Sequence, residues 1–208
     1  HTLDDIKKLG PDADSAFRLL VLQSHYRSSP NYTQKALENA RNSLLELRKF
    51  AQLQHQPNLI VEWDKHGTIQ KESIDELREE LLGLLTDDLR TPQFLAKINQ
   101  AHSQIRSDKL GSKEAFDALR GLIRFIDQSL GLKLLDEKDL TKEQKDLVAL
   151  EDTLWKEAKK ISGSGESYDF SKIDELKDKL ASDYGIIVSN YIGQEGLIWS
   201  RYSIPGDS

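Results

Sequence analysis

Apolar residues recur at intervals of three and four in several separate stretches of the chain, and this spacing limits the possible folds more than any other feature. In the clearest stretch, Leu37, Ala40, Leu44, Leu47 and Ala51 fall on one side of a helix. The same spacing predicts further helices over residues 16–26, 73–85, 91–105, 112–126 and 141–161. The apolar residues predicted to face inward in the last four are Leu77, Leu81, Leu84 and Leu85; Phe94, Ile98, Ala101 and Ile105; Phe116, Leu119, Leu122, Ile123 and Ile126; and Leu147, Leu150, Leu154, Ala158 and Ile161. Helices of this length joined by short loops pack into a bundle.

Polar residues at the predicted helix ends support this interpretation. Thr33 can cap the helix that follows it, and capping-box patterns begin at Ser73 and at Thr141. Thr91 stands before a first-turn proline, which is typical of a helix start. Residues 55–70 break the helical pattern and are predicted to form a loop.

The composition changes after residue 161. The sequence Ser-Gly-Ser-Gly-Glu-Ser over residues 162–167 predicts a flexible linker and a domain boundary. Beyond it, one helix ends at Gly185, and β-rich runs follow over residues 186–191 and 197–202. The predicted fold class is therefore mainly α, a helical bundle followed by a small α+β tail made of a helix and a β-hairpin. The predicted domains are residues 1–32, 33–161 and 168–208.

Composition narrows the functional classes. The 208 residues contain no cysteine, which excludes disulfides and thiolate metal sites, and no run of apolar residues approaches a membrane span. The net charge of −6 argues against non-specific nucleic-acid binding over the whole surface, so any RNA contact would be made by a local patch on an acidic protein. Methionine is absent even at position 1, and we expect the sequence to be a segment of a longer protein.

The sequence predicts neither a catalytic site nor a metal site. The five histidines show no metal-ligand spacing, and no glycine-rich phosphate loop is present. Asp87 and Asp88 form a carboxylate pair, but they precede a helix start, where negative charge is favoured by the amide dipoles.

One group of residues indicates binding. Leu197, Trp199 and Arg201 alternate along the last predicted strand and therefore share one face. A tryptophan and an arginine on one strand face offer a splayed RNA base a stacking plane and a hydrogen-bond donor. Lys177 and Lys179 on the preceding helix add positive charge. The alternative interpretation is that Trp199 anchors the core of a small domain.

Three further motifs occur in order along the chain. The first is Leu20 to Asn31, which contains Arg27 within the sequence His-Tyr-Arg-Ser. The second, residues 85–92, reads Leu-Thr-Asp-Asp-Leu-Arg-Thr-Pro. The third combines residues 174–180 with Gly-Ile-Ile-Val at 185–188 and Gly-Leu-Ile-Trp-Ser-Arg at 196–201. Together these motifs resemble the class I cysteinyl-tRNA synthetases over nearly the whole chain.

The resemblance implies a function as well as a fold. Residues 1–32 would contact the stem of cysteine tRNA, with Arg27 near the acceptor side, residues 33–161 would form the anticodon-side bundle, and residues 168–208 would read the anticodon. In the family, cysteine activation with ATP and a zinc ion belongs to an N-terminal nucleotide-binding domain, whose His-Ile-Gly-His and Lys-Met-Ser-Lys-Ser signatures are not in this sequence. The resemblance thus implies no catalytic residue and no cofactor within this chain. It implies a cytoplasmic, monomeric protein whose partners are cysteine tRNA and the N-terminal catalytic domain of the parent chain.

Some positions depart from the family pattern. The family carries an acidic pair near Ser189 and Asn190, so Asn190 does not fit a carboxylate-based reading of an anticodon base. This departure and the acidic balance motivate an alternative, a helical protein-interaction module derived from a synthetase that does not read RNA. A third possibility is a relative that ligates cysteine to a small amine, such as the mycothiol-pathway ligase. The tail beyond Ser167 argues against it.

Overall fold

A computed structural model describes most of the chain. The described residues are 10, 12–24, 27–28, 32–56, 60, 68–107, 109–136, 139–165, 167–192 and 198–203, and the side chains of 106, 107, 191, 192 and 198–202 are not described. Several predictions fall partly outside these residues: the motif from Leu20 to Asn31, the loop predicted over residues 55–70, and Leu197 of the last predicted strand.

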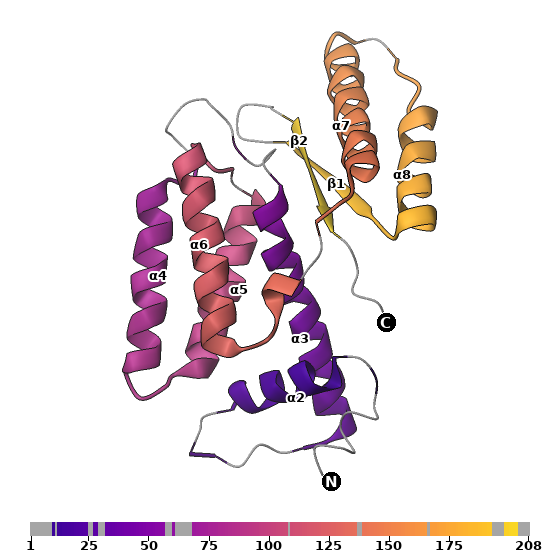
Figure 1. Ribbon diagram of the computed structural model, residues 1–208. Helices are drawn as coiled ribbons and strands as arrows, with labels where there is room; N and C mark the ends of the chain where they lie inside the picture. Colours follow the sequence, from indigo (N-terminus) through magenta and orange to yellow (C-terminus); the bar gives the residue numbers. More distant parts are fainter. Residues whose placement is uncertain are drawn as a thin grey trace.

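In the described part of the chain, five helices build the bundle (Figure 1). They are α2 (Ala13–Leu22), α3 (Gln34–Gln52), α4 (Lys71–Thr86), α5 (Thr91–Ser107) and α6 (Lys113–Leu130). Helices α3 to α6 stand side by side, and α2 lies across the lower end in Figure 1, where it packs on α3. Two short 3-10 turns, η1 (Leu53–His55) and η3 (Leu134–Asp136), follow α3 and α6.

Most of the predicted helix starts are confirmed. The Thr33 hydroxyl accepts a hydrogen bond from the Ala36 amide at 3.0 Å, and Thr141 forms the predicted capping box with Gln144. The capping box predicted at Ser73 is wrong, because α4 begins two residues earlier at Lys71. Ile69, two residues before α4, forms an isolated β-bridge with Leu110, in which its amide donates to the Lys109 carbonyl at 2.7 Å. The helix begins directly after this bridge.

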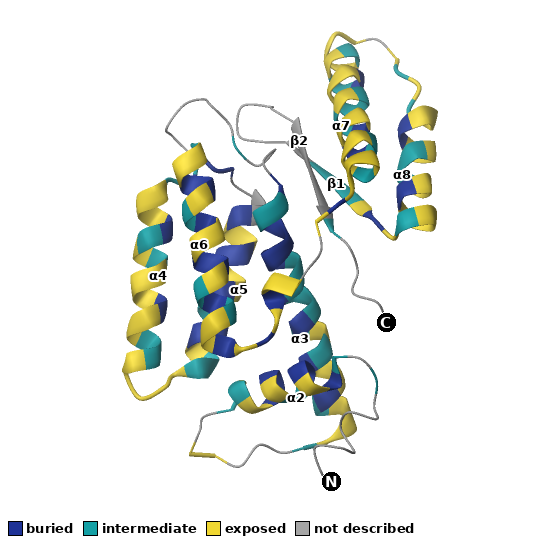
Figure 2. Ribbon diagram, viewed as in Figure 1, coloured by how far each residue is buried: buried dark blue, intermediate teal, exposed yellow. Residues whose placement is uncertain are grey.

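The bundle core consists largely of the predicted apolar faces (Figure 2). All five residues of the 37–51 stripe are buried, and so are the predicted inward residues of α5 and α6: Phe94, Ile98, Ala101, Ile105, Phe116, Leu119, Leu122, Ile123 and Ile126. Helix α4 covers one side of this core and is less deeply buried. Of its four predicted leucines only Leu81 is buried, and Leu77, Leu84 and Leu85 are half-buried.

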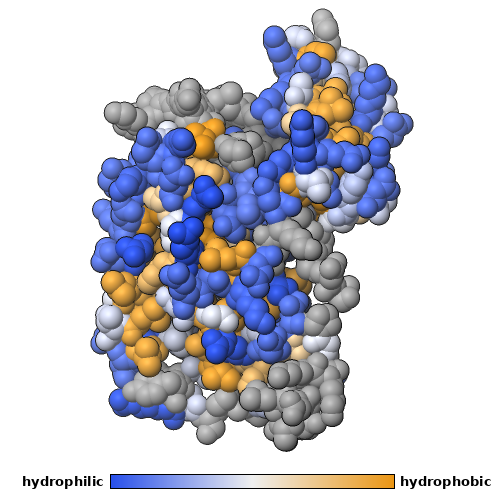
Figure 3. Space-filling model, viewed as in Figure 1, coloured by the Kyte–Doolittle hydropathy of each residue, from blue (hydrophilic) through white to orange (hydrophobic). Residues whose placement is uncertain are grey.

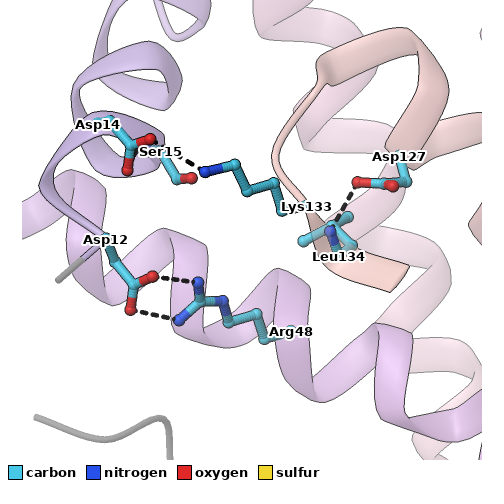
Figure 4. A network of polar contacts seen from close by, with 7 residues as sticks. All are labelled: Asp12, Asp14, Ser15, Arg48, Asp127, Lys133 and Leu134. Carbon is cyan, nitrogen blue, oxygen red and sulfur yellow. Dashed lines mark hydrogen bonds and ion pairs between the residues drawn. The ribbon is translucent and has the colours of Figure 1, made fainter. Parts of the chain in front are cut away.

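Polar contacts attach α2 to the bundle (Figure 4). Arg48 of α3 donates through both terminal nitrogens to the Asp12 carboxylate, at 2.7 and 2.6 Å. Lys133, after α6, donates to Asp14 at 3.2 Å. The hydrogen bond from Arg48 holds the pKa of Asp12 below its usual value, and the hydrogen bond from Lys133 does the same for Asp14. These bonds join three segments that are distant in sequence and fix α2 across the end of the bundle.

The tail comprises α7 (Lys142–Gly163), α8 (Ser171–Tyr184), β1 (Ile187–Ile192) and β2 (Ile198–Ser203). The strands pair antiparallel, from Ile187 opposite Ser203 to Ile192 opposite Ile198. Helix α7 packs against α8 and the hairpin, whereas the sequence pattern grouped residues 141–161 with the bundle. It also extends through the first two residues of the predicted linker. The domain boundaries themselves stay a prediction.

The predicted fold class, mainly α with a small α+β tail, is confirmed. On the face shown in Figure 3, polar side chains predominate, and hydrophobic ones gather over the bundle and between α7 and α8. Among the described residues, no helix is both long and apolar enough to cross a membrane.

Candidate nucleic-acid interface

The tail has a small core of its own, which sets the position of the hairpin. Leu140, Val148, Leu180 and Ile186 are buried together, and half-buried residues of α7, α8 and β1 pack around them. Gly185 ends α8 in the left-handed conformation, with a φ of 64°, which glycine adopts without steric cost. The chain therefore turns sharply from α8 into β1.

A polar cluster lies beside this core and joins three elements: Glu151 of α7, Lys177 of α8 and Asn190 of β1. We call these residues the Glu151 cluster. Lys177 Nζ donates to Asn190 Oδ1 at 2.6 Å, and Asn190 Nδ2 donates to Glu151 Oε2 at 3.2 Å. Lys177 Nζ also forms an ion pair with Glu151 Oε1 at 3.4 Å. Since the Glu151 side chain is 0% exposed, its charge depends on these partners for stabilisation.

Aromatic residues extend the cluster along α7. The Trp155 ring packs edge-on against Phe170, with centroids 5.8 Å apart, and Phe170 packs in turn against Tyr168. The ammonium groups of Lys177 and Lys159 lie 4.9 and 5.1 Å from the centre of the Trp155 ring, within cation–π range. Lys177 is thus surrounded by a carboxylate, an amide and an indole.

The predicted RNA-binding residues of the tail occupy different settings. Lys177 is half-buried and belongs to the Glu151 cluster, whereas Lys179 is exposed on the same helix. Trp199 and Arg201 lie on β2, opposite Tyr191 and Ser189 respectively, and their side chains are outside the description. The fold therefore brings the four tail positions into one small module. Whether they contact RNA stays a prediction.

Arg27 is not part of this group. It forms an ion pair with Asp88 at 3.4 Å in the turn between α4 and α5, and both side chains are well exposed, at 70% and 47%. In this turn Asp88 and Leu89 have positive φ angles of 59° and 48°. The contact joins the first two motifs of the family resemblance at an end of the bundle away from the hairpin (Figure 1).

The tail meets the bundle near Lys109, in the segment between α5 and α6. Lys109 is only 8% exposed, and burial lowers its pKa to about 8. The charges of Lys156 and Asp152 on α7 also affect this pKa, the first lowering and the second raising it, so α7 lies close by. On the other side of the junction, His55 at the end of η1 lies 3.9 Å from Asp139, shortly before α7.

The sequence analysis missed Glu151 and Trp155. The predicted inward stripe of α7 included Leu150, yet Leu150 is 49% exposed while Glu151 is fully buried. A stripe at 148, 151, 155 and 158 has the correct helical spacing, but a count of apolar residues passes over it because it contains a glutamate. Among the described residues, no group of three histidine, aspartate or glutamate side chains could hold a metal ion.

Comparison with known proteins finds that the chain is similar to cysteine–tRNA ligases. The chain is 27% identical to the cysteine–tRNA ligase of Brevibacillus brevis over 191 residues, an alignment that covers 88% of this chain and 38% of that protein. It is 29% identical over 189 residues to the cysteine–tRNA ligase of Alkalilimnicola ehrlichii, covering 89% of this chain and 38% of the relative. The resemblance to cysteine–tRNA ligases is confirmed.

The similarity extends over most of the chain but not over most of its relatives. A third cysteine–tRNA ligase, from Anoxybacillus flavithermus, is 25% identical over 202 residues, which cover 95% of this chain and 40% of that protein. The chain thus spans about two fifths of the length of these cysteine–tRNA ligases. No family model matches the chain.

Proposed function

We propose that this chain binds cysteine tRNA and that its tail reads the anticodon loop. The observation that carries the proposal is the similarity to cysteine–tRNA ligases over 88% of the chain. The fold agrees with it, because the tail presents a short hairpin on a helix pair and the bundle can serve as a rigid spacer. We assign RNA contacts to Lys179, Trp199 and Arg201 in the tail and to Arg27 towards the acceptor side.

We propose a different part for Lys177. Its ammonium group is occupied by Glu151 and Asn190, so we place Lys177 in the support of the hairpin rather than on its RNA-binding surface. With one fewer free cation and a net charge of −6, binding should depend weakly on salt and strongly on base contacts.

In this proposal the chain has a positional role only. Activation of cysteine, with ATP and zinc, belongs to the nucleotide-binding domain of the parent chain, which is the second partner that we propose. The bundle would keep the tail at the anticodon while the segment around Arg27 approaches the acceptor stem.

Filter retention of labelled cysteine tRNA tests the proposal. We expect the wild-type chain to bind it more tightly than a tRNA with an altered anticodon. Arg201→Ala should weaken binding roughly tenfold, as expected for one base or phosphate contact. Lys113→Ala, which removes an exposed cation from the start of α6, is the matched control and should have no effect. Equal affinity for both tRNAs, or no binding at moderate salt, would contradict the proposal and favour a protein-interaction module.

A further inference from the structure

We propose that Asn190 is a positioning residue, which with Glu151 and Lys177 fixes the hairpin on the helix pair in the orientation that anticodon recognition requires. This inference rests on the proposed function and extends it, because it names the residues that set the geometry of the RNA-binding face without contacting RNA.

The three residues of the Glu151 cluster each contact the other two, so their polar contacts form a closed ring. Both ends of the Asn190 amide are used: the carbonyl oxygen accepts from Lys177 at 2.6 Å, and the nitrogen donates to Glu151 at 3.2 Å. The ion pair between Lys177 Nζ and Glu151 Oε1, at 3.4 Å, completes the ring of polar contacts among the three residues. The three residues come from α7, α8 and β1, so the ring holds the strand against both helices at once.

The side-chain amide of Asn190 suits its position between Lys177 and Glu151. Only a side chain that offers a donor and an acceptor can bridge a carboxylate and an ammonium group in this way. An aspartate would turn its second oxygen towards the fully buried Glu151 and place two carboxylates within hydrogen-bond distance. Asparagine at position 190 is therefore matched to glutamate at 151, although the family resemblance leads one to expect an acidic residue there.

The register of the hairpin places Asn190 and the proposed RNA-binding positions 199 and 201 on different faces. Asn190 lies opposite Ser200, whose neighbours on β2 are Trp199 and Arg201. Because strand positions alternate between the two faces of a sheet, positions 199 and 201 fall on the face opposite to Asn190 and Ser200. Asn190 contacts the helices, so its face is the covered one. The ring thus determines which face of the hairpin remains for a nucleic acid.

An exchange of donor and acceptor tests the inference. Asn190→Asp should break the ring, and adding Glu151→Gln should rebuild it with the amide and the carboxylate interchanged and the same net charge. For each variant we would measure affinity for cysteine tRNA and for the anticodon-altered tRNA, and confirm folding by circular dichroism. Asn99→Asp, the same change at an exposed position of α5, is the matched control.

We expect Asn190→Asp to reduce the ratio of the two affinities by about tenfold, within the range of coupled contacts, and the double variant to restore most of it. A variant that only lowers the folded fraction weakens the binding of both tRNAs equally and leaves the ratio of the two affinities unchanged. Such a result would overturn the inference while leaving the proposed function intact.

Three other results would also overturn it. If the double variant stays defective, or if Asn190→Asp tightens binding, position 190 contacts RNA itself. If the wild-type chain does not distinguish the two tRNAs, the proposed function fails and this inference fails with it.

Discussion

Lys177→Met probes the energetics of the Glu151 cluster directly. Methionine keeps most of the apolar stem of lysine but removes the charge, and leaves Glu151 buried with Asn190 as its remaining partner from the cluster. Removing one partner of a buried ion pair typically costs about 3–5 kcal/mol. Since 30% of the Lys177 side chain is exposed, water reaches that side of the pair, and we take the lower end of this range. Loss of the cation–π contact with Trp155 adds about 0.5–1 kcal/mol.

Hydrogen exchange measured by mass spectrometry is the appropriate assay, because it reports on the tail separately from the bundle. The combined loss of about 3.5–4 kcal/mol corresponds to roughly 300- to 700-fold faster exchange in the most protected amides of α7 and α8. Exchange in α5 and α6 should change little. The additional substitution Glu151→Gln removes the buried negative charge that has lost its ion pair with Lys177, and it should recover about 2 kcal/mol.

A small loss of stability in Lys177→Met would refute this prediction. A loss below about 1 kcal/mol is what an exposed ion pair gives, and would mean that Glu151 is not held by Lys177. A double variant no more stable than Lys177→Met would lead to the same conclusion.

Three further predictions concern stability. Gly131→Ala should cost about 1–2 kcal/mol in urea titrations, because Gly131 ends α6 with a φ of 61° and a Cβ there would meet the Arg18 guanidinium. Thr141→Ala removes the capping box and should cost about 1 kcal/mol, visible as faster hydrogen exchange in the first turn of α7. Arg48→Met should cost about 1 kcal/mol at pH 7 through its partly exposed pair with Asp12. Because Arg48 lowers the pKa of Asp12, that contribution is present above about pH 3.8 and is lost as the pH falls through the folded-state value. The variant should therefore lose less stability than the wild type below pH 4 in acid titrations followed by circular dichroism.

The sequence predicted the bundle well because its helices follow one simple rule. In α6 every buried position is apolar, and in α3 every one except Gln52 at the end of the helix; these positions recur at helical spacing, so a count of apolar residues finds the correct face. The same count fails for α7. Its buried face includes Glu151, which is stabilised by Asn190, 39 residues further along the chain. Local periodicity contains no information on such a distant partner.

The candidate interface shows the same limit. Alternation along the last strand predicted that Trp199 and Arg201 share one face, and both positions lie in β2. It did not reveal that Lys177 has partners from α7 and β1, because that depends on how three elements pack. Likewise, the resemblance named Asn190 as a departure from the family, but only the fold connects this departure to Glu151.

The most direct test of the account is hydrogen exchange of the whole chain with and without cysteine tRNA. We expect tRNA binding to slow exchange in β1 and β2, with a smaller effect when the anticodon is altered and no effect in the interior of α6. Protection confined to the bundle, or an equal effect of both tRNAs on the hairpin, would contradict the claim that the tail reads the anticodon.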